Sequence, residues 1–154
     1  MQAINKQIIK NNLIALGQVE LAEKVKYSVS VYQFSYKMMH KGKEITASGL
    51  ISVPNSTESF PVLSFQHGTL VAKSEAPSLN AFANASITSA AAFGYVVLLP
   101  DLIGFGKSDK PSEQSDYNYA KHIEWTHDLI KQLDLQDISL FIQDWGGLIG
   151  LRLV

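Results

Sequence analysis

Hydrophobic residues at helical spacing open the chain. They are Ile4, Ile8, Ile9, Leu13 and Leu16, and Gly17 follows directly. An apolar residue at every third or fourth position predicts an amphipathic helix over about residues 3–16, which ends at the glycine.

Two strand-like runs come next. Residues 26–39 and 45–53 alternate apolar and polar side chains around the turn His40-Lys-Gly-Lys43, which predicts an antiparallel hairpin with a solvated His40 at its turn. Within the first run, Val29 and Val31 fall in the opposite phase to the aromatic positions that follow. A β-bulge near Val31 would reconcile the two phases, so we expect one there.

The pattern then changes to near-continuous apolar runs, at residues 60–66, 95–100 and 138–142. Such runs are typical of strands that are buried on both faces. The segments between them, 79–93 and 117–133, have helical spacing. The first ends at Gly94, and Ser115 or Asp116 would cap the second. The order of elements predicts one α/β domain over residues 1–154, with a sheet that is parallel after an antiparallel hairpin.

The last apolar run ends at Gln143-Asp-Trp-Gly-Gly147, and a helical pattern resumes after it. A strand, a sharp turn and a helix in this order form an elbow that displays one side chain, here Asp144, at the carboxyl end of the sheet. A carboxylate there is already ionised at neutral pH and can attack a carbon that bears a leaving group. Asp is also a good helix N-cap, so the spacing alone leaves both roles open.

A second loop with unusual residues, His67-Gly-Thr69, follows the first buried strand. Gly68 would let the backbone turn so that the Thr69 amide points into the site, where it would form an oxyanion hole with the Trp145 amide. The alternative is a simple strand-ending turn with His67 bonded to nearby backbone, and for His67 itself we favour this alternative. The indole N–H of Trp145 is a donor that could hold a leaving anion.

Two other chemistries fit the pattern poorly. Gly106-Lys-Ser108 follows a buried strand, but a phosphate-binding loop needs Gly where this chain has Asp101. His122 and His127 are five positions apart and would point in different directions from a helix, which argues against a metal site. Trp125 of the same helix is interpreted as a packing residue.

Composition excludes several further classes. The 154 residues are 46% hydrophobic, carry a net charge of -1 and include no cysteine. Without disulfides, thiolate ligands or a basic face, we expect no metal, no cofactor and no nucleic-acid partner. No apolar run approaches membrane-spanning length and the N-terminus lacks a signal-peptide core, so we expect a cytoplasmic protein. The oligomeric state stays open.

The motifs together identify a resemblance to the α/β-hydrolase superfamily. Residues from about 101 to 154 resemble haloalkane dehalogenases, through Pro100-Asp-Leu-Ile-Gly-Phe-Gly-Lys-Ser-Asp-Lys-Pro111, Leu133-Asp-Leu135 and Gln143-Asp-Trp-Gly-Gly147. The resemblance implies that Asp144 is a nucleophile forming an alkyl-enzyme ester, that Trp145 binds halide, and that the amides of Trp145 and Thr69 form the oxyanion hole beside Gly68. Epoxide hydrolases look similar, but their pattern more often has His where this chain has Gln143.

The N-terminal part resembles a different branch. Ala47-Ser-Gly-Leu-Ile-Ser-Val-Pro54 and Phe60-Pro-Val-Leu-Ser-Phe-Gln-His-Gly-Thr-Leu70 look like bacterial lipases or esterases over residues 25–108. A switch near residues 101–108 predicts a chimera of two family members. A lipase would need a Ser elbow, and the sequence contains no Gly-x-Ser-x-Gly.

The resemblance also implies a cap domain, an acid partner and a catalytic His after the elbow helix. None of the four histidines lies where the family's base is expected. We therefore expect a truncated core domain whose Asp144 reacts once with a small hydrophobic haloalkane or ester and does not turn over. An inert fragment, an esterase and an epoxide hydrolase are the alternatives. We also expect low stability, with apolar surface exposed at an unpaired sheet edge.

Overall fold

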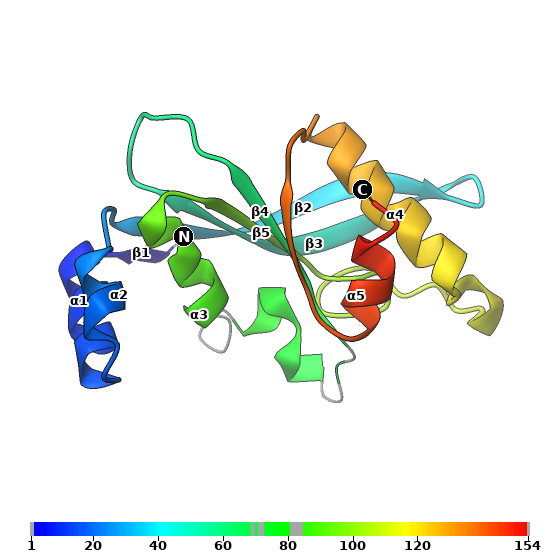
Figure 1. Ribbon diagram of the computed structural model, residues 1–154. Helices are drawn as coiled ribbons and strands as arrows, with labels where there is room; N and C mark the ends of the chain where they lie inside the picture. The colour runs from blue at the N-terminus through cyan, green and yellow to red at the C-terminus, as the bar shows by residue number, and fades with distance from the viewer. Residues whose placement is uncertain (1, 69, 71–72, 81–84, 154) are drawn as a thin grey trace.

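A mixed β-sheet runs through the protein in the computed structural model, which describes residues 2–68, 70, 73–80 and 85–153 (Figure 1). Its strands lie in the order β1-β2-β3-β5-β4-β6. Their bounds are β1 Gln2–Ile4, β2 Val29–His40, β3 Lys43–Pro54, β4 Val62–Gln66, β5 Val96–Pro100 and β6 Ser139–Ile142. The strand β4 pairs in parallel with β5 and β6, and the remaining pairs are antiparallel. The predicted α/β sheet, parallel after an antiparallel hairpin, is confirmed.

The hairpin of β2 and β3 has no bulge. Its register is continuous from Val29 opposite Pro54 to His40 opposite Lys43, so the bulge expected near Val31 is wrong. Val29 and Val31 pack into an apolar cluster on one face of the sheet, whereas Met38 packs into a second cluster on the opposite face. The apolar phase therefore changes along a regular strand, because its two ends bury opposite faces of the sheet.

Helices and short helical turns join the strands. Their bounds are α1 Lys6–Ala15, α2 Val19–Glu23, α3 Ala85–Thr88, α4 Tyr119–Gln132 and α5 Trp145–Gly150, with 3₁₀ turns η1 Lys73–Glu75, η2 Pro77–Leu79, η3 Ser89–Phe93 and η4 Gln114–Asp116. The helix predicted over about residues 3–16 is α1, but residues 3 and 4 belong to strand β1 and not to the helix. Neither β1 nor α2 was foreseen. A single helix was expected over 79–93, but Leu79 ends η2 and residues 81–84 lie outside the described residues. The rest is α3 followed by η3, and Gly94 ends it in a left-handed conformation, as predicted.

The start of α4 differs from its prediction. Asn118 is the N-cap, and its side chain accepts a hydrogen bond from the Lys121 amide at 3.1 Å. Ser115 and Asp116, the expected caps, precede it, and Asp116 instead forms an ion pair with His40 (Nε2 to Oδ2, 3.1 Å). His40, expected to be solvated, is therefore buried.

Two apolar clusters lie on opposite faces of the sheet, because neighbouring residues of a strand point to opposite sides. The larger cluster packs α1 and η3 on one face and includes Ile9, Val29, Val31, Leu50, Ala91, Ala92, Val97 and Leu99. The other cluster packs α4 on the opposite face through Met38, Ala47, Ile103 and Trp125. Trp125 is thus a packing residue, as predicted.

The strand β6 lies at the edge of the sheet, and Phe141 on it is 49% exposed. Leu148 and Leu151, which come after it in the chain, are also exposed. Apolar surface at this edge was expected. Among the described residues, no helix has both the length and the apolar character needed to cross a membrane.

Candidate active site at the elbow after β6

The loops after β4 and β6 meet at one end of the sheet, because these two strands pair in parallel from Leu63 opposite Ser139 to Gln66 opposite Ile142. The Gln143 amide continues this pairing with a 3.4 Å hydrogen bond to the Gln66 carbonyl. The chain then turns sharply into α5 (Figure 1). This places the elbow beside the His67-Gly68 turn.

Asp144 occupies the elbow itself. Its φ of 50° and ψ of −120° form a conformation that is costly for a residue with a Cβ, and such strain is concentrated at functional sites. Asp144 stands at the N-cap position of α5, but its side chain makes no capping hydrogen bond, and the residue is exposed. The geometry therefore gives the helix-cap interpretation no support.

Two glycines allow the elbow to form. A Cβ on Gly146 would overlap with the backbone carbonyl of Gln66, so the first turn of α5 can approach β4 only without a side chain there. A Cβ on Gly68 would lie 3.0 Å from the Cβ and 3.5 Å from Oδ2 of Asp144. The Gly68 backbone therefore lies beside the Asp144 side chain.

His67 is bound to backbone on both sides of its ring. Nδ1 lies 2.8 Å from the Gly68 carbonyl, and Nε2 accepts a hydrogen bond from the Leu102 amide at 3.2 Å. This confirms the interpretation of His67 as part of a strand-ending turn. Burial lowers the pKa of His67, although its bond to Gly68 and the charge of Asp101 oppose that shift.

Trp145 and Thr69 are the other residues that the sequence places in the site. Trp145, the first residue of α5, is half-buried, and its ring meets that of Tyr119 edge-on at 5.9 Å. The Tyr119 hydroxyl donates to the Leu148 carbonyl at 2.7 Å and so ties α4 to α5. No local pattern of residues predicts this contact. Thr69 lies outside the described residues.

The loop after β5 wraps around a buried carboxylate and not around a phosphate site. Asp101 accepts hydrogen bonds from the Ser48 hydroxyl at 2.6 Å, the Ser78 amide at 2.9 Å and the Lys107 amide at 3.2 Å. A Cβ on Gly106 would overlap with this carboxylate. The Gly-Lys-Ser motif thus serves to enclose Asp101.

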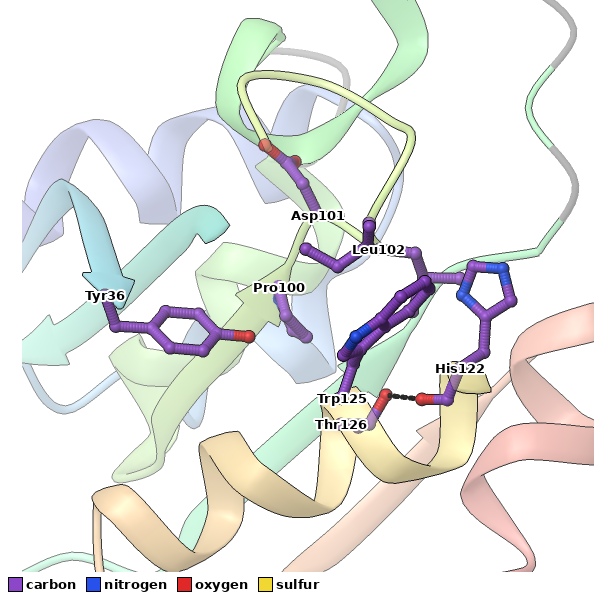
Figure 2. A pocket seen from close by; sticks show the side chains of 8 residues that line it. Tyr36, Pro100, Asp101, Leu102, His122, Trp125 and Thr126 are labelled. Carbon is purple, nitrogen blue, oxygen red and sulfur yellow. Dashed lines mark hydrogen bonds between the residues drawn. The ribbon is translucent and has the colours of Figure 1, made fainter. Parts of the chain in front are cut away.

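A small cavity lies between the end of β5 and α4. Figure 2 shows Pro100, Asp101 and Leu102 on one side and His122, Trp125 and Thr126 of α4 on the other, with the Asp101 carboxylate pointing toward the loop. Burial lowers the pKa of His122 and raises that of Tyr36. The described residues include no group of three or more side chains that could hold a metal ion.

Comparison with known proteins agrees with this geometry. Residues 61–154, more than half of the chain, match the α/β hydrolase fold family. The chain belongs to this family. Both halves of the elbow and the His67-Gly68 turn lie inside the matched region.

Relatives of known activity refine the placement. A haloalkane dehalogenase from Psychrobacter cryohalolentis is 59% identical over 63 residues, which are 41% of this chain and 21% of the relative. One from Mycobacterium bovis is 58% identical over 62 residues, or 40% of this chain and 21% of the relative. The chain therefore has haloalkane dehalogenase relatives within the α/β hydrolase fold family. It spans about a fifth of the length of these relatives.

Solved structures extend the likeness to the N-terminal part. Haloalkane dehalogenase DpaA from Paraglaciecola agarilytica is 31% identical with a TM-score of 0.59, covering 78% of this chain and 37% of its own. A mutant of the rice cell wall degrading esterase LipA from Xanthomonas oryzae is 20% identical with a TM-score of 0.65, covering 99% and 42%. The esterase likeness shows a shared fold. The identity of 58–59% to haloalkane dehalogenases extends over 62 or 63 residues of the chain.

Proposed function

We propose that this chain carries the nucleophilic half of a haloalkane dehalogenase-type hydrolase, with Asp144 as the nucleophile. The observation that carries the proposal is the elbow. Asp144 has strained backbone angles, is exposed and has Gly68 packed against it. The identity of 59% to a haloalkane dehalogenase supports the choice of reaction.

In the proposed step, a carboxylate oxygen of Asp144 attacks the carbon that bears the halogen. A C–O bond forms, the C–halogen bond breaks, and the halide leaves with the bonding electron pair. The product is an ester between Asp144 and the alkyl group. We propose that the indole N–H of Trp145, the next residue, donates a hydrogen bond to the departing halide. The backbone amides of Trp145 and Thr69 are the proposed oxyanion hole.

Release of the product needs a base that activates water. His67 is the histidine next to the elbow turn, but both of its ring nitrogens are bonded to backbone. His40 forms an ion pair with Asp116, and His122 lies buried against Trp125. We therefore expect the alkyl ester to persist on this chain.

Intact-protein mass spectrometry after incubation with a long 1-chloroalkane tests the proposal. We expect a single added alkyl group on Asp144, and no addition in Asp144→Asn. The exposed Asp137→Asn variant is the matched control and should be labelled like the parent. A folded chain that gains no mass from the chloroalkane would refute the proposal, and labelling by an alkyl epoxide instead would favour the epoxide hydrolase alternative.

A further inference from the structure

Gly68 approaches two neighbouring residues of the elbow. A Cβ on Gly68 would lie 3.0 Å from the Asp144 Cβ and 3.2 Å from the Gln143 carbonyl oxygen. The place and direction of the Gly68 backbone therefore limit the space that is available to the Asp144 side chain on this side.

His67 fixes that backbone from within the protein. It is 3% exposed, and its ring bridges the Gly68 carbonyl and the Leu102 amide. A carbonyl oxygen can only accept, so Nδ1 carries the proton, and an amide N–H can only donate, so Nε2 carries none. The two bonds select one neutral tautomer of the ring.

The far end of this bridge is itself anchored. Leu102 directly follows Asp101, whose buried carboxylate is held by Ser48, Ser78 and Lys107. The ring of Phe105 meets the His67 ring edge-on at 5.6 Å. The loop after β5 thus holds the Leu102 amide in place, and the hydrogen bond from this amide fixes the position of the His67 ring.

We propose that His67 is a positioning residue for Asp144: its Nδ1–H holds the Gly68 carbonyl and thereby keeps the Gly68 backbone against the nucleophile. This inference rests on the proposed function, because it assigns the bond a purpose in the reaction of Asp144. His67 does not touch the substrate and acts through Gly68 alone.

The arrangement also predicts a dependence on pH. A second proton, on Nε2, would face the N–H of Leu102 and break the bridge. Two titratable groups interact with His67. The Asp101 carboxylate favours the added proton, and a charge on His67 lowers the pKa of His122. Alkylation of Asp144 should therefore slow as the pH falls through the lowered pKa of His67.

Three variants separate the two bonds of the ring. His67→Ala removes both, His67→Asn can keep a donor near the position of Nδ1, and His67→Gln can keep an acceptor near the position of Nε2. Chloroalkane labelling followed by mass spectrometry gives a maximal rate and a half-saturating concentration for each. We expect His67→Ala to lower the maximal rate about tenfold, the size of one lost hydrogen bond, with an unchanged half-saturating concentration. His67→Asn should recover most of the rate and His67→Gln little of it.

The exposed His127→Gln variant is the control, and it should be labelled like the parent. An unchanged maximal rate in His67→Ala, or a better recovery in His67→Gln than in His67→Asn, would overturn the proposal.

Nuclear magnetic resonance separates this inference from the proposed function. The ring nitrogens of His67 should show a proton on Nδ1 and none on Nε2. The amide signals of Gly68 and Asp144 should move in His67→Ala and stay near their parent positions in His67→Asn. If the parent is never labelled but these signals behave as stated, the proposed function fails while His67 still positions the elbow. If the signals of Gly68 and Asp144 are the same in all variants, the positioning role fails.

Discussion

Gly146 lies directly against the carbonyl group of Gln66, so the elbow helix and the strand beside it are in backbone contact. Gly146→Ala would force these two backbones apart, and we expect it to lower the free energy of unfolding by about 1–3 kcal/mol. Urea unfolding followed by circular dichroism measures the loss.

The next residue of the same helix is the matched control. A Cβ on Gly147 would meet nothing within 4 Å. Gly147→Ala should therefore leave the stability unchanged or raise it by up to about 1 kcal/mol, since Ala favours a helix over Gly. Equal losses in the two variants would contradict the backbone contact.

The contrast between these glycines shows which part of the elbow can be predicted from the sequence and which part cannot. The spacing of Asp144, Gly146 and Gly147 predicted the elbow, because a sharp turn followed by close packing needs small residues. It did not say which glycine makes the contact, since that depends on the position of β4 in space. The contact of Gly68 with Asp144 is also non-local: the two residues lie 76 positions apart and meet only when β4 pairs with β6.

Tertiary contacts likewise explain the errors. His40 is the last residue of β2 and directly precedes a turn, a position typical of solvated residues, but α4 and the segment before it cover this end of the hairpin. The bulge at Val31 was inferred from a phase change, which arises equally well in a regular strand whose two ends bury opposite faces of the sheet. In both cases the local pattern was interpreted correctly as a strand and a turn, and the covering element could not be inferred from it.

Gly68→Ala tests the contact at the candidate nucleophile. The added methyl group would press on the Asp144 Cβ at 3.0 Å, which is backbone-proximal and cannot rotate away. Small displacements of reacting groups strongly reduce the reaction rate, so we expect alkylation of Asp144 to be about tenfold to hundredfold slower. The measurement is labelling by a chloroalkane, with Gly147→Ala as the control. Parent-like labelling of a folded Gly68→Ala protein would show that this contact does not affect the reaction.

Asp101→Asn addresses the loop after β5. The Asp101 carboxylate accepts three hydrogen bonds, from Ser48, Ser78 and Lys107. In Asp101→Asn an NH₂ group replaces one of the accepting oxygens, so two donors would face each other with no acceptor between them. A buried unsatisfied group costs about 1–3 kcal/mol, which should appear as a loss of stability in urea unfolding. The exposed Asp137→Asn variant removes the same charge without such contacts and should have little effect. Similar losses in both would assign the effect to net charge.

The ion pairs at the hairpin turn predict a loss of stability in acid. Asp116 lies 2.6 Å from Lys41 Nζ and 3.1 Å from His40 Nε2, and these partners, Lys41 first, hold its pKa below the ordinary 3.8. Because the folded pKa is lowered, the stabilisation is present above 3.8 and is lost as the pH falls through the lower value. Asp116→Asn should therefore reduce the melting temperature at neutral pH but not in strong acid. Glu113→Gln, which removes the exposed partner of Lys41, should change little at either pH.

The buried imidazoles predict a second loss of stability, at mildly acidic pH. Burial lowers the pKa values of His67 and His122 below 6.5, and His122 Nδ1 has no hydrogen-bond partner among the described residues. The unfolded chain therefore binds more protons than the folded one just below 6.5, and the free energy of unfolding must decrease as the pH falls from there toward the lowered values. The slope can reach about 1.4 kcal/mol per pH unit for each imidazole. Unfolding measured between pH 8 and 5 should show this decrease, weakened in His122→Gln and retained in the exposed His127→Gln, and a flat profile would contradict the burial of both rings.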